Sequence, residues 1–150
     1  MYRPLPDGLT IKDSNFYVAA SEALTDAIIS GCGCIGTYED QDVNFIAIPS
    51  YQLYFLDNAK GEIDTVFREH ELTGQYIIEK YGEVLDEDMR QSCTEDPYKK
   101  HKALESCFRM PNETDYTYVV QIGKDNKIME MRKMPVPMFT VFKFGNTVGD

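Results

Sequence analysis

The sequence has no tryptophan, few bases, and no apolar run of about 18 residues that could cross a membrane as a helix. Its opening stretch, Met1 to Lys12, also lacks the continuous apolar run of a signal peptide. The 15 lysines and arginines face 25 acids, so the formal net charge is −10 and the chain as a whole repels phosphate. We therefore expect a cytoplasmic chain that binds neither a membrane nor a nucleic acid tightly.

Cysteines are present, but none has the paired spacing of a zinc or redox site. The four are Cys32, Cys34, Cys93 and Cys107. We expect reduced thiols, because the pair around Gly33 is explained more simply by small buried residues at the end of a helix than by redox chemistry. No metal is predicted.

The two histidines, His70 and His101, have no partner at metal-ligand spacing. His70 and Glu71 open the pattern of a zinc-protease helix, but Gly74 stands where the second histidine belongs. We expect His70 to lie on the surface at the end of a strand. A glycine-rich phosphate loop is also missing, since Gly31 and Gly33 are typical of a helix stop, so no cofactor is predicted.

Acidic residues cluster at Glu39-Asp40, Asp86-Glu87-Asp88 and Glu95-Asp96. Such clusters can hold a divalent ion, but they more often solvate turns. A catalytic acid pair needs a pocket that shifts one pKa, and the sequence indicates no such pocket. No serine stands in a nucleophile-elbow context. The sequence therefore predicts no catalytic residue.

A folded domain is nevertheless predicted, since 43% of the 150 residues are hydrophobic. From Phe16 to Ser30 apolar residues recur at three- and four-residue steps, which predicts an amphipathic helix. The apolar residues of this pattern are Phe16, Ala20, Ala23, Leu24, Ala27 and Ile28. Ser14 or Asn15 can cap its start, and glycines follow its end.

After the glycines the pattern changes to short aromatic and β-branched runs, which predict strands. The predicted strands are Cys34 to Tyr38, Val43 to Ile48, Tyr51 to Leu56, Glu62 to Glu69, Ala103 to Met110, Tyr116 to Ile122, Ile128 to Arg132 and Met138 to Phe144. Short helices are predicted at Leu72 to Tyr81 and Asp86 to Cys93, and a loop at Thr94 to Lys102. Consecutive strands joined by tight turns favour a mostly antiparallel sheet, so the fold class is α+β.

Three parts of the chain carry a resemblance to a known family. They are Phe16 to Gly33, the run Phe45-Ile46-Ala47-Ile48-Pro49, and Tyr54 to Tyr81 with its string Asn58-Ala59-Lys60-Gly61-Glu62-Ile63-Asp64-Thr65-Val66-Phe67-Arg68. In order and spacing, the chain from Phe16 to its C-terminus resembles the portal, or head-to-tail connecting, protein of short-tailed phages (podoviruses).

This resemblance implies a structural subunit and no enzyme, in a ring of about a dozen copies held by heterologous contacts that close by rotation. DNA would pass through the ring during packaging and ejection without sequence-specific binding. The implied partners are neighbouring subunits and, for the full-length protein, the capsid, the terminase and tail-adaptor proteins. The implied location is the virion, with the host cytoplasm during assembly. Exposed aromatics are candidates for subunit contacts: Tyr51, Tyr54, Phe55 and Phe67.

The two ends suggest a division of the chain. Pro137 to Phe144 and Gly149-Asp150 look like the approach to a family turn that leads into a long helix, so residues 16–150 are expected to be a partial wing region that stops before the stem. Met1 to Ser14 look more like the opening of small SET-domain lysine methyltransferases, which suggests a separate origin for the irregular lead-in 1–15. A small methyltransferase is therefore one alternative, although no asparagine precedes a histidine as in that family's S-adenosylmethionine motif. A non-catalytic acidic interaction module is the other.

Overall fold

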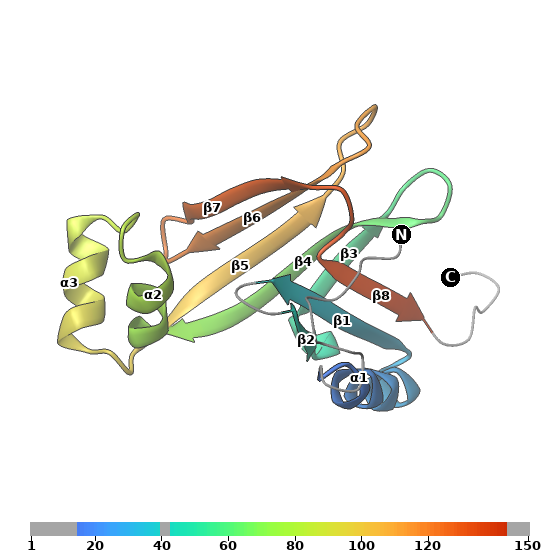
Figure 1. Cartoon of the computed structure of the whole chain (residues 1–150), viewed down its shortest axis with the longest axis horizontal. Coiled ribbons are helices and arrows are strands. Elements are labelled where there is room, and N and C mark those ends of the chain that lie inside the picture. The colour runs from blue at the N-terminus through green and yellow to red at the C-terminus, as the bar shows by residue number, and fades with distance from the viewer. Residues whose placement is uncertain (1–14, 40–42, 144–150) are drawn as a thin grey trace.

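The computed structural model describes residues 15–39 and 43–143, which form three α-helices, one short 3-10 helix and eight strands (Figure 1). In chain order these are α1 (Phe16–Ser30), β1 (Cys32–Glu39), β2 (Val43–Ala47), η1 (Ser50–Gln52), β3 (Leu53–Asp57), β4 (Ile63–Thr73), α2 (Gly74–Tyr81), α3 (Glu87–Glu95), β5 (Lys100–Phe108), β6 (Tyr116–Ile122), β7 (Lys127–Met134) and β8 (Phe139–Lys143).

The strands form two sheets, and every strand pair in them is antiparallel. A three-stranded sheet has the order β2-β1-β8, and a five-stranded sheet has the order β3-β4-β5-β6-β7. Figure 1 shows α1 beside the small sheet, and α2 with α3 at one end of the large one. The α+β class predicted from the sequence is confirmed.

The core lies between the two sheets and beneath α2. The small sheet and the segments that flank it contribute Cys34, Ile48, Met138 and Phe139, and α2 contributes Ile77 and Tyr81. From the large sheet come Val66, Ala103, Cys107, Tyr118, Val120 and Ile122. One face of the large sheet is therefore covered by two separate bodies, the small sheet and α2.

Helix α1 begins and ends as its sequence predicts, with Gly31 at φ 87° after the last turn, but it buries only part of the predicted apolar face. Its buried residues are Ala19, Ala23 and Ala27, so the predicted apolar face is buried at Ala23 and Ala27, whereas Leu24 and Ile28 are exposed. The cause is close packing: a Cβ at Gly33 on β1 would lie 2.6 Å from the Ala23 carbonyl oxygen. At that spacing only small side chains fit between helix and sheet.

The β3–β4 hairpin forms where the sequence predicts it. The Asn58 side-chain oxygen accepts hydrogen bonds from the backbone N–H groups of Lys60 and Glu62, at 2.8 and 3.0 Å, and Gly61 takes φ 77°. Beyond it, β4 runs to Thr73, so α2 starts later than predicted. Thr73 caps α2 by accepting a hydrogen bond from the Tyr76 backbone.

The predicted loop 94–102 is shorter in the structure, because α3 extends to Glu95 and β5 already begins at Lys100. Pairing with β4 draws Lys100 and His101 into the sheet, opposite Thr73 and Leu72. The predicted strand at Tyr51 instead starts with the 3-10 turn η1 after Pro49, and β3 begins at Leu53.

Candidate functional site

A glutamate lies in the middle of the covered face of the large sheet. Glu105 is on the central strand β5, directly opposite Arg68 on β4 and Val120 on β6, and it is only 5% exposed. A buried carboxylate is costly unless it is paired and hydrogen-bonded, so its partners determine what the site can do.

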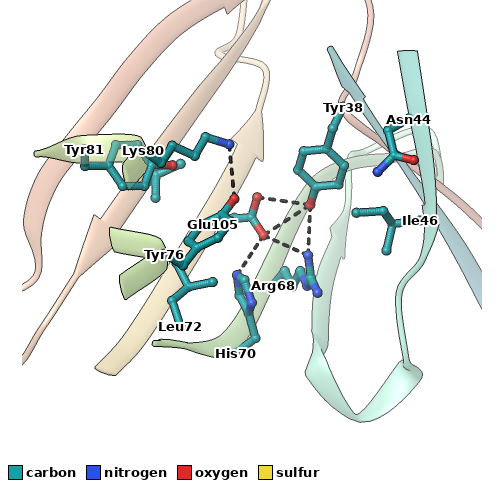
Figure 2. Close-up of a pocket in the computed structure, with 11 residues that line it drawn as sticks. Tyr38, Asn44, Ile46, Arg68, His70, Leu72, Tyr76, Lys80, Tyr81 and Glu105 are labelled. Atoms are coloured by element: carbon teal, nitrogen blue, oxygen red, sulfur yellow. Dashed lines mark hydrogen bonds and ion pairs between the residues drawn. The ribbon is translucent and has the colours of Figure 1, made fainter. Parts of the chain in front are cut away.

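Four side chains from three strands surround this carboxylate, and Figure 2 shows three of them, Tyr38, Arg68 and His70. The Tyr38 hydroxyl, on β1 of the small sheet, donates to both carboxylate oxygens at 3.0 and 3.2 Å, and the Tyr118 hydroxyl on β6 donates at 2.5 Å. From β4, Arg68 Nη1 lies 3.2 Å from Oε2 and His70 Nε2 lies 2.9 Å from it. We call Glu105 and these four residues the Glu105 cluster.

Arg68 is held in place by further contacts. Arg68 donates through Nε to Gln52 at 3.0 Å and through Nη1 to the Tyr38 hydroxyl at 3.0 Å. Nε2 of His70 is buried and lies 2.9 Å from Oε2 of Glu105. The cluster thereby connects β1 of the small sheet to β4, β5 and β6 of the large one.

The electrostatics of the cluster keep Glu105 ionised. Burial by itself raises the pKa of Glu105, but the contact with His70, the Tyr118 hydrogen bond and the charge of Arg68 outweigh burial and leave that pKa below its ordinary value. Burial and the adjacent carboxylate raise the pKa of both Tyr38 and Tyr118, so both hydroxyls remain proton donors. A carboxylate with a lowered pKa and its lone pairs occupied cannot act as a general acid near neutral pH.

A pocket of about 190 Å³ opens above this cluster, between the small sheet and α2. Its lining includes Asn44 and Ile46 from β2, Leu72 from β4, and Tyr76, Lys80 and Tyr81 from α2 (Figure 2). The Lys80 ammonium lies 3.4 Å from the Tyr76 hydroxyl and 5.8 Å from the centre of the Tyr81 ring. The Arg68–Glu105 ion pair lies at the base of this pocket.

A cysteine and a histidine meet elsewhere, with 3.9 Å between Cys93 Sγ and His101 Nε2. Such a pair can form a thiolate nucleophile only when the thiol pKa falls. Here burial raises the pKa of Cys93 and lowers that of His101, so both side chains stay neutral. The pair lacks the electrostatics of an activated nucleophile.

His70 was expected on the surface, and this prediction was wrong. Its side chain is 12% exposed and contacts Glu105, because β4 continues three residues past His70 and keeps its ring beneath the pocket. The alternation of Arg68 and His70 on one strand face was a usable signal. The pairing of that face with Glu105 could not be predicted, because α2 and α3 separate β4 from β5 in sequence.

The cysteines and acidic clusters considered as possible sites in the sequence have the following surroundings. All four cysteines are free thiols, and burial raises the pKa of Cys34 to about 12. Asp86 caps α3 by accepting from the Met89 backbone and pairs with Lys127. Within residues 15–39 and 43–143, no group of three or more potential ligands is placed to hold a metal ion.

The four aromatic residues predicted at subunit contacts lie in different environments. Tyr51 in η1 is 81% exposed, whereas Phe55 on β3 packs against the core. Tyr54 and Phe67 lie opposite each other on β3 and β4, on the outer face of the large sheet, away from Glu105. Their role in a subunit interface stays a prediction.

Comparison with known families supplies the decisive observation. The model of the family described as bacteriophage head to tail connecting protein matches residues 10–147. The chain belongs to this family. It confirms the resemblance described above and assigns the chain a structural role as a phage connector, a component of the virion that joins other head and tail proteins. No curated protein matches the chain.

The alternative of a small methyltransferase concerns Met1 to Ser14, which lie outside the described residues. The family match begins at residue 10 and so includes the end of that stretch. In the part of the chain that the structure describes, no helix is long and apolar enough to cross a bilayer.

Proposed function

We propose that this connector-family chain forms part of the portal ring through which phage DNA is packaged and ejected, and that it catalyses no reaction. The observation that carries the proposal is the match of the connector family to residues 10–147, and the Glu105 cluster supports a structural role. Its carboxylate is ionised, neutralised by Arg68, and hydrogen-bonded by two tyrosines from different sheets. This chemistry fixes two sheets against each other.

Two further features support a passive conduit. The net charge of −10 disfavours phosphate contacts, so a duplex moving past such subunits meets few electrostatic traps. The described architecture, a helix and two packed sheets, suits the wing of a portal subunit, to which we assign residues 16–150. Neighbouring subunits in the ring, the capsid, the terminase and the tail adaptor are the partners proposed for the full-length protein, and assembly takes place in the host cytoplasm.

Deletion of the coding sequence from the phage that encodes this chain tests the proposal. We expect heads without packaged DNA, which electron microscopy and the content of nuclease-resistant DNA would detect. Packaging should be restored when the intact gene is supplied on a plasmid. Phage that still produce DNA-filled, infectious particles after the deletion overturn the proposal.

A further inference from the structure

The pocket above the Glu105 cluster is large enough for a small organic molecule. Its volume is about 190 Å³, whereas a protein cavity of about 150 Å³ already holds benzene. The floor is polar and largely buried, since it is formed by Arg68, His70 and Glu105. A ligand of the size of a benzene ring with one short polar group therefore fits.

The walls of the pocket are mainly apolar and aromatic. They include Ile46 on β2, Leu72 on β4, Val120 on β6, and Tyr76 and Tyr81 on α2. Figure 2 shows Ile46 on one side of the cluster and Tyr76 with Leu72 on the other. Walls of this composition bind the hydrocarbon part of a ligand, and a few polar groups among them set its orientation.

One cation at the pocket has no carboxylate partner. In the part of the chain that the structure describes, the exposed ammonium of Lys80 forms no ion pair. It lies 3.4 Å from the Tyr76 hydroxyl instead, and Figure 2 shows this contact beside Glu105. Because Lys80 donates to the Tyr76 oxygen, the Tyr76 hydrogen can be donated to a ligand. An ammonium and a hydroxyl this close can each bind one oxygen of the same carboxylate.

The charge of the pocket selects a ligand with one negative charge. Arg68 and Lys80 contribute two positive charges and Glu105 one negative charge, so the lining carries +1 when His70 is neutral, in a chain of net charge −10. The Arg68–Glu105 pair is already balanced, which leaves Lys80 for the ligand. A phosphate dianion would bring a second negative charge towards Glu105, whereas a carboxylate brings only the charge that Lys80 neutralises.

We propose that this pocket binds a small organic carboxylate. Its carboxylate lies at Lys80 and Tyr76, and its apolar part lies between Ile46 and Leu72. The site goes beyond the proposed portal function and does not depend on it. The same chemistry is carried by a free acid and by an aromatic residue with a free carboxylate at the C-terminus of a partner protein, and the experiment separates these two sources.

An NMR titration of the isotope-labelled chain measures the binding. The probe is phenylacetate, and phenylacetamide is its uncharged control of nearly the same shape. We expect phenylacetate to shift the backbone amide signals of residues 44, 46, 72, 76 and 80, with a dissociation constant on the order of millimolar, as is typical of a ligand of this size. Phenylacetamide should bind about fivefold more weakly, because it lacks the charge that Lys80 neutralises.

Two variants at exposed positions of α2 test the polar contacts. Lys80→Gln should weaken phenylacetate binding about fivefold and leave phenylacetamide binding unchanged. Lys60→Gln is the matched control, since it removes the same charge from the chain at an exposed residue of the β3–β4 turn, and it should bind phenylacetate as the wild type does. Tyr76→Phe keeps the ring and removes the hydroxyl, so it should also weaken phenylacetate selectively. Melting curves check that each variant folds.

A second pair of probes identifies the source of the carboxylate. N-acetylphenylalanine has the same ring and carboxylate on a peptide backbone, and its amide is the uncharged control. Tighter binding of N-acetylphenylalanine than of phenylacetate supports the C-terminus of a partner protein. The reverse order supports a free acid.

Three results overturn the inference. The first is that neither acid shifts the signals of the pocket at concentrations well above millimolar. The second is that the amides bind as tightly as the acids, or that Lys80→Gln and Lys60→Gln bind phenylacetate equally. The third is that inorganic phosphate binds the pocket more tightly than phenylacetate.

Discussion

Tyr38 and Glu105, 67 positions apart in sequence, join the two sheets through hydrogen bonds of 3.0 and 3.2 Å from one hydroxyl to both carboxylate oxygens. The small sheet approaches the large one at this point through polar groups inside an otherwise apolar core. The predictions below follow from the charge, the hydrogen bonds and the close packing around that contact.

Replacing Glu105 by glutamine should destabilise the fold strongly. Arg68 would remain buried without its counter-charge, which costs about 3 kcal/mol in the free energy of unfolding. Urea denaturation measures the change. Glu113→Gln is the control, because Glu113 and Lys133 form a pair whose side chains are 44% and 54% exposed, and its loss should cost less than about 1 kcal/mol. Equal effects of the two substitutions would contradict the role of the cluster.

Acid should destabilise the protein partly through the same carboxylate. The pKa of Glu105 is below its ordinary value of 4.5 in the folded chain, so the folded state binds the proton less tightly than the unfolded state. Its contribution is complete above pH 4.5 and disappears as pH falls through the folded-state pKa. Unfolding free energies measured from pH 7 to pH 2 should fall less steeply for Glu105→Gln. An unchanged acid limb in that variant sinks this prediction.

Alkaline pH should act through the tyrosines with the opposite sign. The pKa of Tyr118 is raised above its ordinary value of 10.0, so the folded state retains the phenolic proton that the unfolded state loses. Stability should therefore decline as pH rises above 10, and Tyr118→Phe should flatten that decline. Thermal melts across this range, with Tyr51→Phe as an exposed control, provide the comparison.

Removing the Tyr38 hydroxyl should loosen the contact between the sheets. Tyr38→Phe loses hydrogen bonds to a charged group, which costs about 2 kcal/mol. Because Tyr38 and Glu105 interact directly, its effect combined with Glu105→Gln should be clearly non-additive in a double-mutant cycle. Additive free energies would show that the two residues act independently.

Gly33→Ala should displace α1 from the small sheet. The new Cβ would lie 2.6 Å from the Ala23 carbonyl oxygen and 2.6 Å from the Phe142 ring, a clash that includes backbone. We expect a loss of about 2 kcal/mol or more. Gly61→Ala is the comparison, because Gly61 has φ 77° and no atom within 4 Å of an added Cβ, so this substitution strains the backbone without a clash. We expect Gly61→Ala to cost about 1 kcal/mol in the free energy of unfolding. Circular dichroism melts measure both.

The sequence was sufficient for the type and order of the elements, because their signals are local. The helix predicted at Leu72 to Tyr81 and the two strands predicted on either side of residues 57–61 all form, because Thr73 caps the helix and Asn58 closes the turn through their own side chains. Which face of α1 is buried depended instead on Gly33, a residue of another element whose missing side chain brings the sheet close.

The Glu105 cluster could not be predicted for a related reason. Its members come from β1, β4, β5 and β6, and their meeting depends on the register of β4 against β5 and on the docking of one sheet on another. In sequence Glu105 is an acid between Leu104 and Ser106, with alternation as its one indication of a buried face. Non-local pairing supplies the rest.

The pairing of β1 with both β2 and β8 has a consequence for the timing of synthesis. β8 reaches Lys143, so a chain growing on a ribosome can form the β1–β2 hairpin early but completes the small sheet only after residue 143 has emerged, more than 90 residues after the end of β2. Until then the seat of α1 lacks one of its strands.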